Sequence, residues 1–536
     1  MAGSSAVDAS EASTERSARG PSWVRRAVAS QWTWILAGTL VLVTAWLPTW
    51  RVPVIGDDFY YSLGRYYDYG GSVWTVLANA WHDDLQPNRY NPVGREFSLT
   101  NHVLARESSA WWGVDLTYYF RVQTLALIWG AVLAGSFAFR AAVRYVHPSN
   151  QVRLWPVFAG LAAGYAVVMQ LHINSHDPSI TIAEIGYGTP ILAFALMTLA
   201  FRLVTPPARW PRAAVAYCVL ALVGTVYYET FVTAVAACTA LFVVEWLRGR
   251  LPRRRLLWLV GAGAALPASV ALAGRAWVAT QDVPYYRGTD LVLGPEGLKV
   301  LANFVLGTVP GSAWPHTTFA IGGAPLSVPG IAGGLLIGVL ATVIAWGLLR
   351  GGMPRLRPGR GLWWVAAVYG AHLIGSFAMQ SFTTKYVREI WHHHVVYLAY
   401  GTAVIMVATA ALVAFAFLPR RGVTRAMPVV LVAITAFAVA QQSVNVAVAN
   451  HLREVYRGPL LVASEVTTDA GTDATRCAAL RELSLGNPFH DMGSFPELAE
   501  EINVGYAWDF GMAFCTDTER IVEEAPEPLV PEPQVE

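Results

Sequence analysis

The fold is decided by residues 32–50, WTWILAGTLVLVTAWLPTW, and by residues 56–62, GDDFYYS, which follow closely. The first stretch contains no charged residue, and it is close to the roughly 20 residues that a helix needs to cross the hydrocarbon core of a membrane. The second stretch places the adjacent carboxylates of Asp57 and Asp58 a few residues beyond that span. The chain is therefore expected to enter a membrane early and to hold an acidic pair at its surface.

The composition of the whole chain agrees with a membrane protein. It has 54% hydrophobic and 14% charged residues, which is more apolar surface than a soluble globule of 536 residues can bury. The formal net charge is only +2, so no basic excess indicates nucleic-acid binding. We therefore expect lipid to surround much of the chain, and we expect no nucleic-acid partner.

Further apolar runs predict an all-α polytopic membrane protein with about eleven transmembrane helices. The stretch 213–247 is too long for one span, so we expect a hairpin of two short spans with Tyr227, Tyr228 and Glu229 at its tip. The remaining runs lie at 118–139, 154–173, 186–204, 256–279, 328–349, 361–380, 395–418 and 426–445.

Arginines set the expected orientation of these spans. Alternate connecting segments hold twenty-two of the 38 Lys and Arg residues, and such segments stay on the cytoplasmic side. The N-terminus is therefore predicted to be cytoplasmic. The basic segments are 1–31, 140–153, 202–212, 248–255, 350–360 and 419–425. The opposite face then receives loops 51–117, 172–186, 280–327 and 381–394, together with the tail from residue 446.

Four regions follow from this layout. We expect a disordered cytoplasmic tail over 1–31, because this segment is rich in Ser, Ala and charge and has no apolar core of its own. The transmembrane domain is expected over 32–445. A small extracytoplasmic domain is expected over 446–522, too short and polar for a large core, and an acidic, Pro-rich disordered end over 523–536.

The four cysteines fall into two pairs with different expectations. Cys477 and Cys515 lie in the polar tail, where an oxidising compartment would allow them to form a disulfide. Cys218 and Cys238 lie inside apolar runs and are expected to act as small packing residues.

Loop 51–117 is expected to contain a helix of its own. Apolar residues recur at helical spacing from Val73 to Trp81, which predicts a helix lying in the membrane interface. Asp83 and Asp84 end this helix in a polar stretch, so we expect them to be solvated.

The pair Asp57 and Asp58 is the strongest candidate for chemistry. Two carboxylates held against a membrane can take a proton from a hydroxyl, and they can coordinate a divalent cation such as Mg²⁺ or Mn²⁺. The plainer alternative is that both carboxylates solvate a loop or cap a short helix.

Loop 172–186 offers a second set of polar groups. It carries two histidines at i,i+4 spacing, the second being His176, with Asp177 beside them and Glu184 further on. This spacing could place both histidines on one helical face as metal ligands, but Pro178 favours the end of a helix. We therefore expect hydrogen bonding to a sugar or to water.

Two further places combine charge with an apolar surrounding. Glu229 lies between two apolar spans, where a carboxylate is costly unless it faces water, a partner or the bundle interior. Lys385, Arg388 and His392 in loop 381–394 share one face if that loop is helical, and such cations suit a lipid phosphate. The alternative for these cations is an anchoring role at the level of the lipid headgroups.

The string GDDFYYS, placed directly after the first span, resembles the Asp-Asp-aromatic motif of the GT-C superfamily of integral membrane glycosyltransferases. The likeness is to bacterial members of the O-antigen glucosyltransferase type. Three further elements are similar to motifs of these enzymes: Gly94-Arg95 in the same loop, IGYGTP at 185–190, and Tyr228-Glu229-Thr230 at the hairpin tip. The resemblance covers the membrane region to about residue 445.

The resemblance implies transfer of a sugar from a polyprenyl-phosphate donor to a cell-envelope glycan, lipid or protein. This transfer would take place on the outer face of a bacterial plasma membrane, with Asp57 or Asp58 as the base. A transporter or flippase of a lipid-linked saccharide stays open as an alternative, as does a non-catalytic envelope-assembly protein. The sequence lacks the internal symmetry that is typical of transporters. Candidates for substrate binding are Arg95, His176, Asp177, Tyr187 and Glu229, and candidates for the donor phosphate are Lys385, Arg388 and His392.

Overall fold

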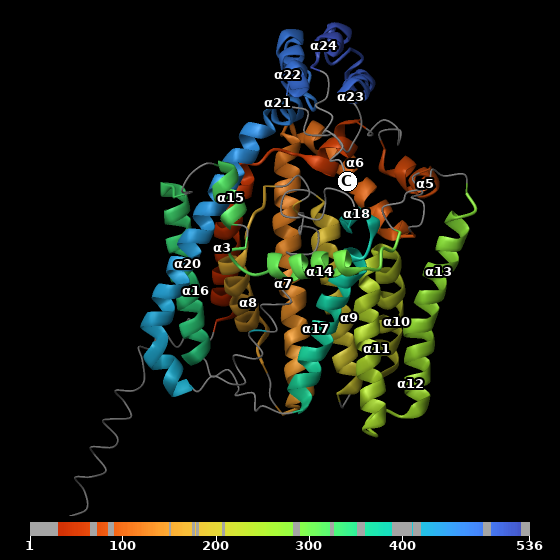
Figure 1. The fold of residues 1–536 in the computed structure, drawn as a ribbon, viewed down its shortest axis with the longest axis vertical. Coiled ribbons are helices and arrows are strands. Elements are labelled where there is room, and N and C mark those ends of the chain that lie inside the picture. Colours follow the sequence, from red (N-terminus) through yellow and green to blue (C-terminus); the bar gives the residue numbers. More distant parts are fainter. Residues whose placement is uncertain are drawn as a thin grey trace, which may run out of the picture.

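In the computed structural model of the chain, the regular secondary structure of the described residues is helical, apart from one antiparallel bridge between Leu291 and Thr383. Its long helices run side by side as a bundle, and a group of short helices covers one end (Figure 1). The structure describes residues 30–64, 72–83, 90–149, 152–173, 177, 182–205, 210–281, 290–312, 314–321, 326–350, 360–387, 410, 420–485 and 495–526.

Nine helical segments in these ranges are long and apolar enough to cross a membrane, which supports the predicted polytopic membrane architecture. The hairpin expected over 213–247 is present, because α10 and α11 are separated by the short turn η4. The elements of the nine segments are α3 (Gln31–Trp46) with η1 (Leu47–Arg51), α7 (Leu116–Val146), α9 (Ala183–Val204), α10 (Trp210–Tyr227), η4 (Glu229–Phe231) with α11 (Val232–Leu247), α12 (Arg253–Val260) with η5 (Gly261–Ala265) and α13 (Leu266–Val278), α16 (Val328–Arg350), α17 (Arg360–Ser381) and α20 (Arg420–Val455).

Two of the eleven expected spans are not among these nine segments, and one of the two lies where the structure does not describe the chain. The run at 154–173 forms only α8 (Leu154–Val168), whose 15 residues are too few for a full crossing. The run at 395–418 lies outside the described residues, except for Ala410. The apolar run around α8 is thus longer than the helix that it forms.

The chain beyond α8 leaves the helix because a side chain of α20 satisfies its backbone. Asn445 accepts a hydrogen bond from the amide of Leu171 at 2.9 Å and donates one to the carbonyl of Met169 at 3.0 Å. Unwound backbone beside a membrane requires such partners, because lipid supplies none. A polar residue of α20 therefore decides where α8 ends.

The short helices at one end of the bundle come mainly from the predicted outer loops (Figure 1). The helix expected from Val73 to Trp81 is present as α5, whereas the helix α14 lying across the bundle was not predicted. This group consists of α4 (Gly56–Phe59), the π-helical turn η2 (Tyr60–Gly64), α5 (Val73–Asp83), the longer α6 (Pro92–Trp112), α14 (Pro295–Gly307), α15 (Trp314–Ile321) and α18 (Thr384–Val387).

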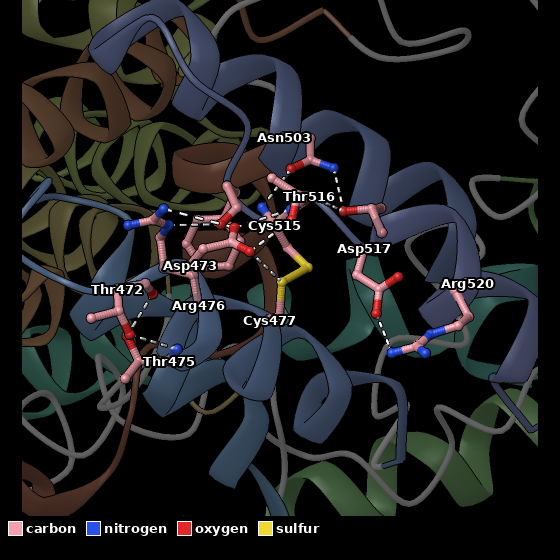
Figure 2. The surroundings of a disulfide bond; sticks show 12 residues. Thr472, Asp473, Thr475, Arg476, Cys477, Asn503, Cys515, Thr516, Asp517 and Arg520 are labelled. Carbon is pink, nitrogen blue, oxygen red and sulfur yellow. Dashed lines mark hydrogen bonds and ion pairs between the residues drawn. A yellow bond between two sulfur atoms is a disulfide. The ribbon is translucent and has the colours of Figure 1, made fainter.

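The tail forms a helical cap at the same end of the bundle (Figure 1), made of α21 (Arg457–Glu465), α22 (Asp473–Leu485), α23 (Phe495–Phe510) and α24 (Thr518–Glu524). The predicted disulfide between Cys477 and Cys515 joins α22 to the segment after α23 (Figure 2). Cys218 and Cys238 are free, as expected for packing residues.

The cap does not stand alone as the small separate domain that the sequence suggested. Its apolar residues share one core with Phe59 and with Phe120 of α7. Phe59 belongs to α4, the acidic turn that carries Asp57 and Asp58. The boundary expected at residue 446 is also not a structural break, since α20 continues to Val455. At the other end α24 runs to Glu524, and residues 527–536 lie outside the described residues. The cap and the acidic turn therefore pack as one unit.

Candidate functional site

The turn α4 holds the acidic pair directly after the first span. Gly56 begins it with a φ of 60°, a left-handed conformation that favours glycine. Phe59 fixes the turn from its buried side. Asp58 is only 1% exposed, whereas Asp57 is half-buried. The turn thus directs Asp58 into the protein and leaves Asp57 nearer the surface.

Arg121 of α7 secures the segment that leads into this turn. Its buried guanidinium donates hydrogen bonds to the carbonyl of Val52 at 3.1 and 3.2 Å and to the carbonyl of Pro53 at 2.6 Å. Its positive charge also acts on Asp58 and Asp177. A buried arginine is stable only with such partners, so Arg121 ties α7 to the acidic turn.

Asp58, His102 and Glu184 form one buried group inside the protein, although they come from three different elements, α4, α6 and α9. Asp58 Oδ1 lies 3.2 Å from His102 Nε2 and accepts a hydrogen bond from the amide of Ile182 at 3.1 Å. One potential ligand atom from each of the three side chains lies within 4.8 Å of the others, and all three residues are buried. Asp57, the other half of the predicted pair, is not part of this group.

The orientation of His102 is fixed by its own helix. Its Nδ1 lies 2.6 Å from the carbonyl oxygen of Ser98, one turn earlier, and a carbonyl can only accept, so Nδ1 carries a proton. Nε2 therefore faces Asp58. Burial alone would lower the pKa of His102, but the hydrogen bond to Asp58 and the charges of Asp58 and Glu184 outweigh it and raise this pKa.

Glu184 has one satisfied and one unsatisfied carboxylate oxygen. Ser98 donates its hydroxyl to Oε1 at 2.8 Å, and Tyr227 donates its hydroxyl to the backbone carbonyl of Glu184 at 2.5 Å. Oε2 is buried and makes no hydrogen bond within the described residues. Such an atom is uncommon in a native interior, where a proton, a water molecule or a bound ion can account for it.

The backbone is strained at Ile182, which lies two residues before Glu184 and contacts Asp58. Its φ of 43° and ψ of 36° are left-handed, which is uncommon for a β-branched residue. The conformation aims its amide at Asp58, and Ile182 immediately precedes α9, whose first two residues are Ala183 and Glu184. Strain of this kind concentrates at functional sites, where the surrounding structure enforces it.

The Gly94-Arg95 element lies at the edge of the group. Arg95 donates a hydrogen bond to the Tyr61 hydroxyl at 3.1 Å, and the Tyr61 ring lies 5.5 Å from the ring of His102. A Cβ on Gly94 would come within 1.9 Å of the Tyr227 carbonyl oxygen, so glycine lets α6 approach the end of α10. Arg95 is thereby placed one side chain away from the buried group.

The helix α6 carries most of what the sequence interpretation missed. Its buried side carries a polar stripe beside Leu99 and Val103, and its exposed side includes Trp111 and Trp112, which is unlike a soluble amphipathic helix. A polar stripe at spacings of three and four inside a membrane protein is therefore the sequence signal by which this site could have been found. The stripe consists of Ser98, His102, Arg106 and Ser109.

The other predicted residues lie in different surroundings. Asp177 is fully buried and accepts a hydrogen bond from the His172 amide at 2.9 Å. Tyr187 is fully buried too, but its hydroxyl meets that of Tyr165 at 2.7 Å inside the packed bundle. Glu229 is half-buried in the hairpin turn. Asp177 is linked to the buried group through Arg121, whose positive charge acts on both Asp177 and Asp58.

The predicted phosphate-binding cations are only partly covered by the structure. Arg388 and His392 lie outside the described residues, and so does His176. The backbone of Lys385 belongs to α18, but its side chain is not described. In the same way Asp83 is described only as the end of α5, and Asp84 lies outside the described ranges.

Two surface pockets lie away from Asp58, His102 and Glu184. One, of about 630 Å³, follows apolar residues of α10 from Pro211 to Val223, toward the end of the helix away from Tyr227. The other, of about 290 Å³, lies beside Arg51 and Gln442, where the first span ends. Neither is lined by a residue of the buried group.

No protein-family model, no curated protein and no solved structure was found to match this chain, so the site is interpreted from its own geometry.

Proposed function

We propose that this chain is a membrane glycosyltransferase of the GT-C type. It would transfer a sugar from a polyprenyl-phosphate donor to a cell-envelope glycan, lipid or protein on the outer face of a bacterial plasma membrane. The observation that carries the proposal is the acidic pair directly beyond the first span, with Asp58 buried against His102 and Glu184 and Asp57 left partly exposed.

The two aspartates then have different roles. A general base must touch the hydroxyl from which it takes a proton. Asp58 is 1% exposed, and one of its oxygens already contacts Ile182 and His102. Asp57 is half-buried and adjacent, so it is the catalytic base in this proposal, and Asp58 is a positioning residue.

The reaction is a direct displacement. The acceptor hydroxyl oxygen forms a bond to the anomeric carbon while Asp57 takes the hydroxyl proton. The bond between that carbon and the phosphate oxygen breaks, and polyprenyl phosphate leaves with the electron pair. Attack opposite to the leaving group inverts the anomeric centre.

The leaving phosphate requires cations, and the segment from Lys385 onward would supply them. The start of this segment is held in place, because the Thr384 amide donates to the Asp290 carbonyl at 2.8 Å and Val292 donates to Phe382, also at 2.8 Å. Loops 280–327 and 381–394 are thereby joined. This junction supports a donor site built from both loops.

The test is an assay of the full-length protein in detergent with a panel of radiolabelled polyprenyl-phosphate sugars and an envelope extract as acceptor. We expect transfer from at least one donor, and a loss on the order of a hundredfold or more in Asp57→Asn. Asp83→Asn, at the end of α5, should keep wild-type turnover. If Asp57→Asn transfers sugar at the wild-type rate, Asp57 is not the base; if no donor is consumed, the proposed activity is wrong.

A further inference from the structure

The group Asp58, His102 and Glu184 has the composition of a metal site. It offers one imidazole nitrogen and two carboxylates from α4, α6 and α9, and all three residues are buried. Its members are held by the fold rather than by one flexible loop. Three protein ligands are also the number that catalytic zinc sites use, which leaves a coordination position for a water molecule.

The tautomer of His102 adds a second argument. Because Nδ1 donates to the Ser98 carbonyl, a neutral ring presents the lone pair of Nε2 toward Asp58 Oδ1, 3.2 Å away. Two lone pairs at this distance repel unless a proton or a cation lies between them. Metal-binding histidines characteristically donate their other ring nitrogen to a carbonyl or carboxylate, as His102 does.

The net charge of the buried group is suited to a divalent cation. When both carboxylates are ionised, Asp58 and Glu184 contribute two negative charges, and a proton on His102 neutralises only one of them. The positive charge of Arg121 acts on Asp58, and it also acts on Asp177 and Asp115, so it is shared among three carboxylates. An uncompensated charge is costly in a buried site, and a divalent cation would remove it.

Two hydrogen bonds of Ser98 complete the arrangement. Its carbonyl orients His102, and its hydroxyl orients Glu184 Oε1 at 2.8 Å. The other oxygen of this fully buried residue, Oε2, makes no hydrogen bond within the described residues. One residue therefore positions two potential ligands, while an oxygen of the second still lacks a partner.

We propose that Asp58, His102 and Glu184 bind one divalent cation of the Mn²⁺ to Zn²⁺ class. Imidazole favours these ions over Mg²⁺ and Ca²⁺, and the two carboxylates suit Mn²⁺ and Zn²⁺ alike. The ion is held by Asp58 with residues of two other elements, instead of by the pair Asp57 and Asp58. The inference stands on the ligand geometry and does not rest on the proposed sugar transfer.

The test uses the full chain in detergent, stripped with a chelator and titrated separately with ZnCl₂ and MnCl₂ by calorimetry and metal analysis. We expect one ion per chain. Ser98→Ala should weaken binding about 10- to 100-fold, because it removes an outer hydrogen bond without removing a ligand. His372→Ala, which alters another buried histidine, should bind as the wild type does.

The unaltered protein provides a test that is independent of how any variant folds. Pulsed electron paramagnetic resonance of bound Mn²⁺ should show coupling to an imidazole ¹⁴N, and His102→Asn should abolish it. No stoichiometric ion, an ion without nitrogen coupling, or wild-type affinity in both Ser98→Ala and Glu184→Gln would each overturn the site. Asp57→Asn should keep the ion, so failure here is distinguishable from failure of the proposed transfer.

Discussion

Arg106 on α6 and Asp509 on α23 form an ion pair between residues 403 positions apart, with Asp509 Oδ2 accepting from Nε at 3.2 Å and from Nη2 at 2.8 Å. Arg106 is one turn beyond His102, and its side chain is 1% exposed against 20% for Asp509. The cap is therefore joined to the helix that supplies a residue of the buried group.

We expect Asp509→Ala to loosen the cap. The change leaves the buried Arg106 without this partner, which typically costs about 1–3 kcal/mol. Limited proteolysis should cleave the tail faster, and the thermal unfolding midpoint should fall. Asp517→Ala is the control, because its pair with Arg520 is solvent-exposed and such pairs contribute about 0–1 kcal/mol. Equal behaviour of the two variants would contradict the role assigned to the buried pair.

The disulfide gives a prediction about both stability and compartment. Cys477 and Cys515 are separated by 38 residues, and closing a loop of that length stabilises a fold by about 4 kcal/mol in the chain-entropy account. Thiol labelling of denatured, unreduced protein from native membranes should detect only Cys218 and Cys238. All four cysteines should label after reduction. Labelling of all four without reduction would argue against an oxidising compartment for the cap.

Replacing Gly94 should disturb the junction between α6 and α10. An added Cβ would meet the Tyr227 carbonyl oxygen at 1.9 Å, and overpacking of this kind costs about 1–3 kcal/mol. Gly94→Ala should therefore lower the unfolding temperature. Gly370→Ala is the matched change in a helix with open space around it, and it should be neutral or stabilising. A stabilised Gly94→Ala would show that the two helices do not approach as described.

Asp473 should make the cap sensitive to acid. The Thr516 hydroxyl donates to it at 2.7 Å and the Thr516 amide at 3.1 Å (Figure 2), and these bonds lower the pKa of Asp473. A lowered folded-state pKa stabilises the fold above the unfolded pKa, and this contribution is lost as the pH falls through the folded pKa.

The comparison is therefore between wild type and Asp473→Asn across the pH range below about 4. We expect the variant to unfold at a lower temperature at neutral pH, and the difference to shrink as the pH falls below that value. A difference that stays constant down to the lowest pH would mean that the charge of Asp473 does not contribute.

Much of the architecture could be predicted from the sequence because lipid imposes a local rule. A span must be apolar and must satisfy its own backbone hydrogen bonds, so residues 32–50 predict a helix without reference to the rest of the chain. The hairpin around Glu229, the helix from Val73 and the pairing of Cys477 with Cys515 were also accessible from spacing and composition. Each of these depends on neighbours in sequence, or on a choice among very few partners.

The tertiary structure decided the rest. The sequence identified Asp58 by its position after the first span, but His102 lies 44 residues away and Glu184 accepts from Ser98 across 86 residues. A periodicity within one helix does not link residues of different helices. Buried polar contacts at these separations are set by the packing of α4, α6 and α9, which the strained backbone at Ile182 and the glycine at position 94 permit. The sequence by itself determined where the chain can cross a membrane, and only the folded arrangement determined which polar groups meet inside it, because burial forces such groups to find partners wherever the packing places them.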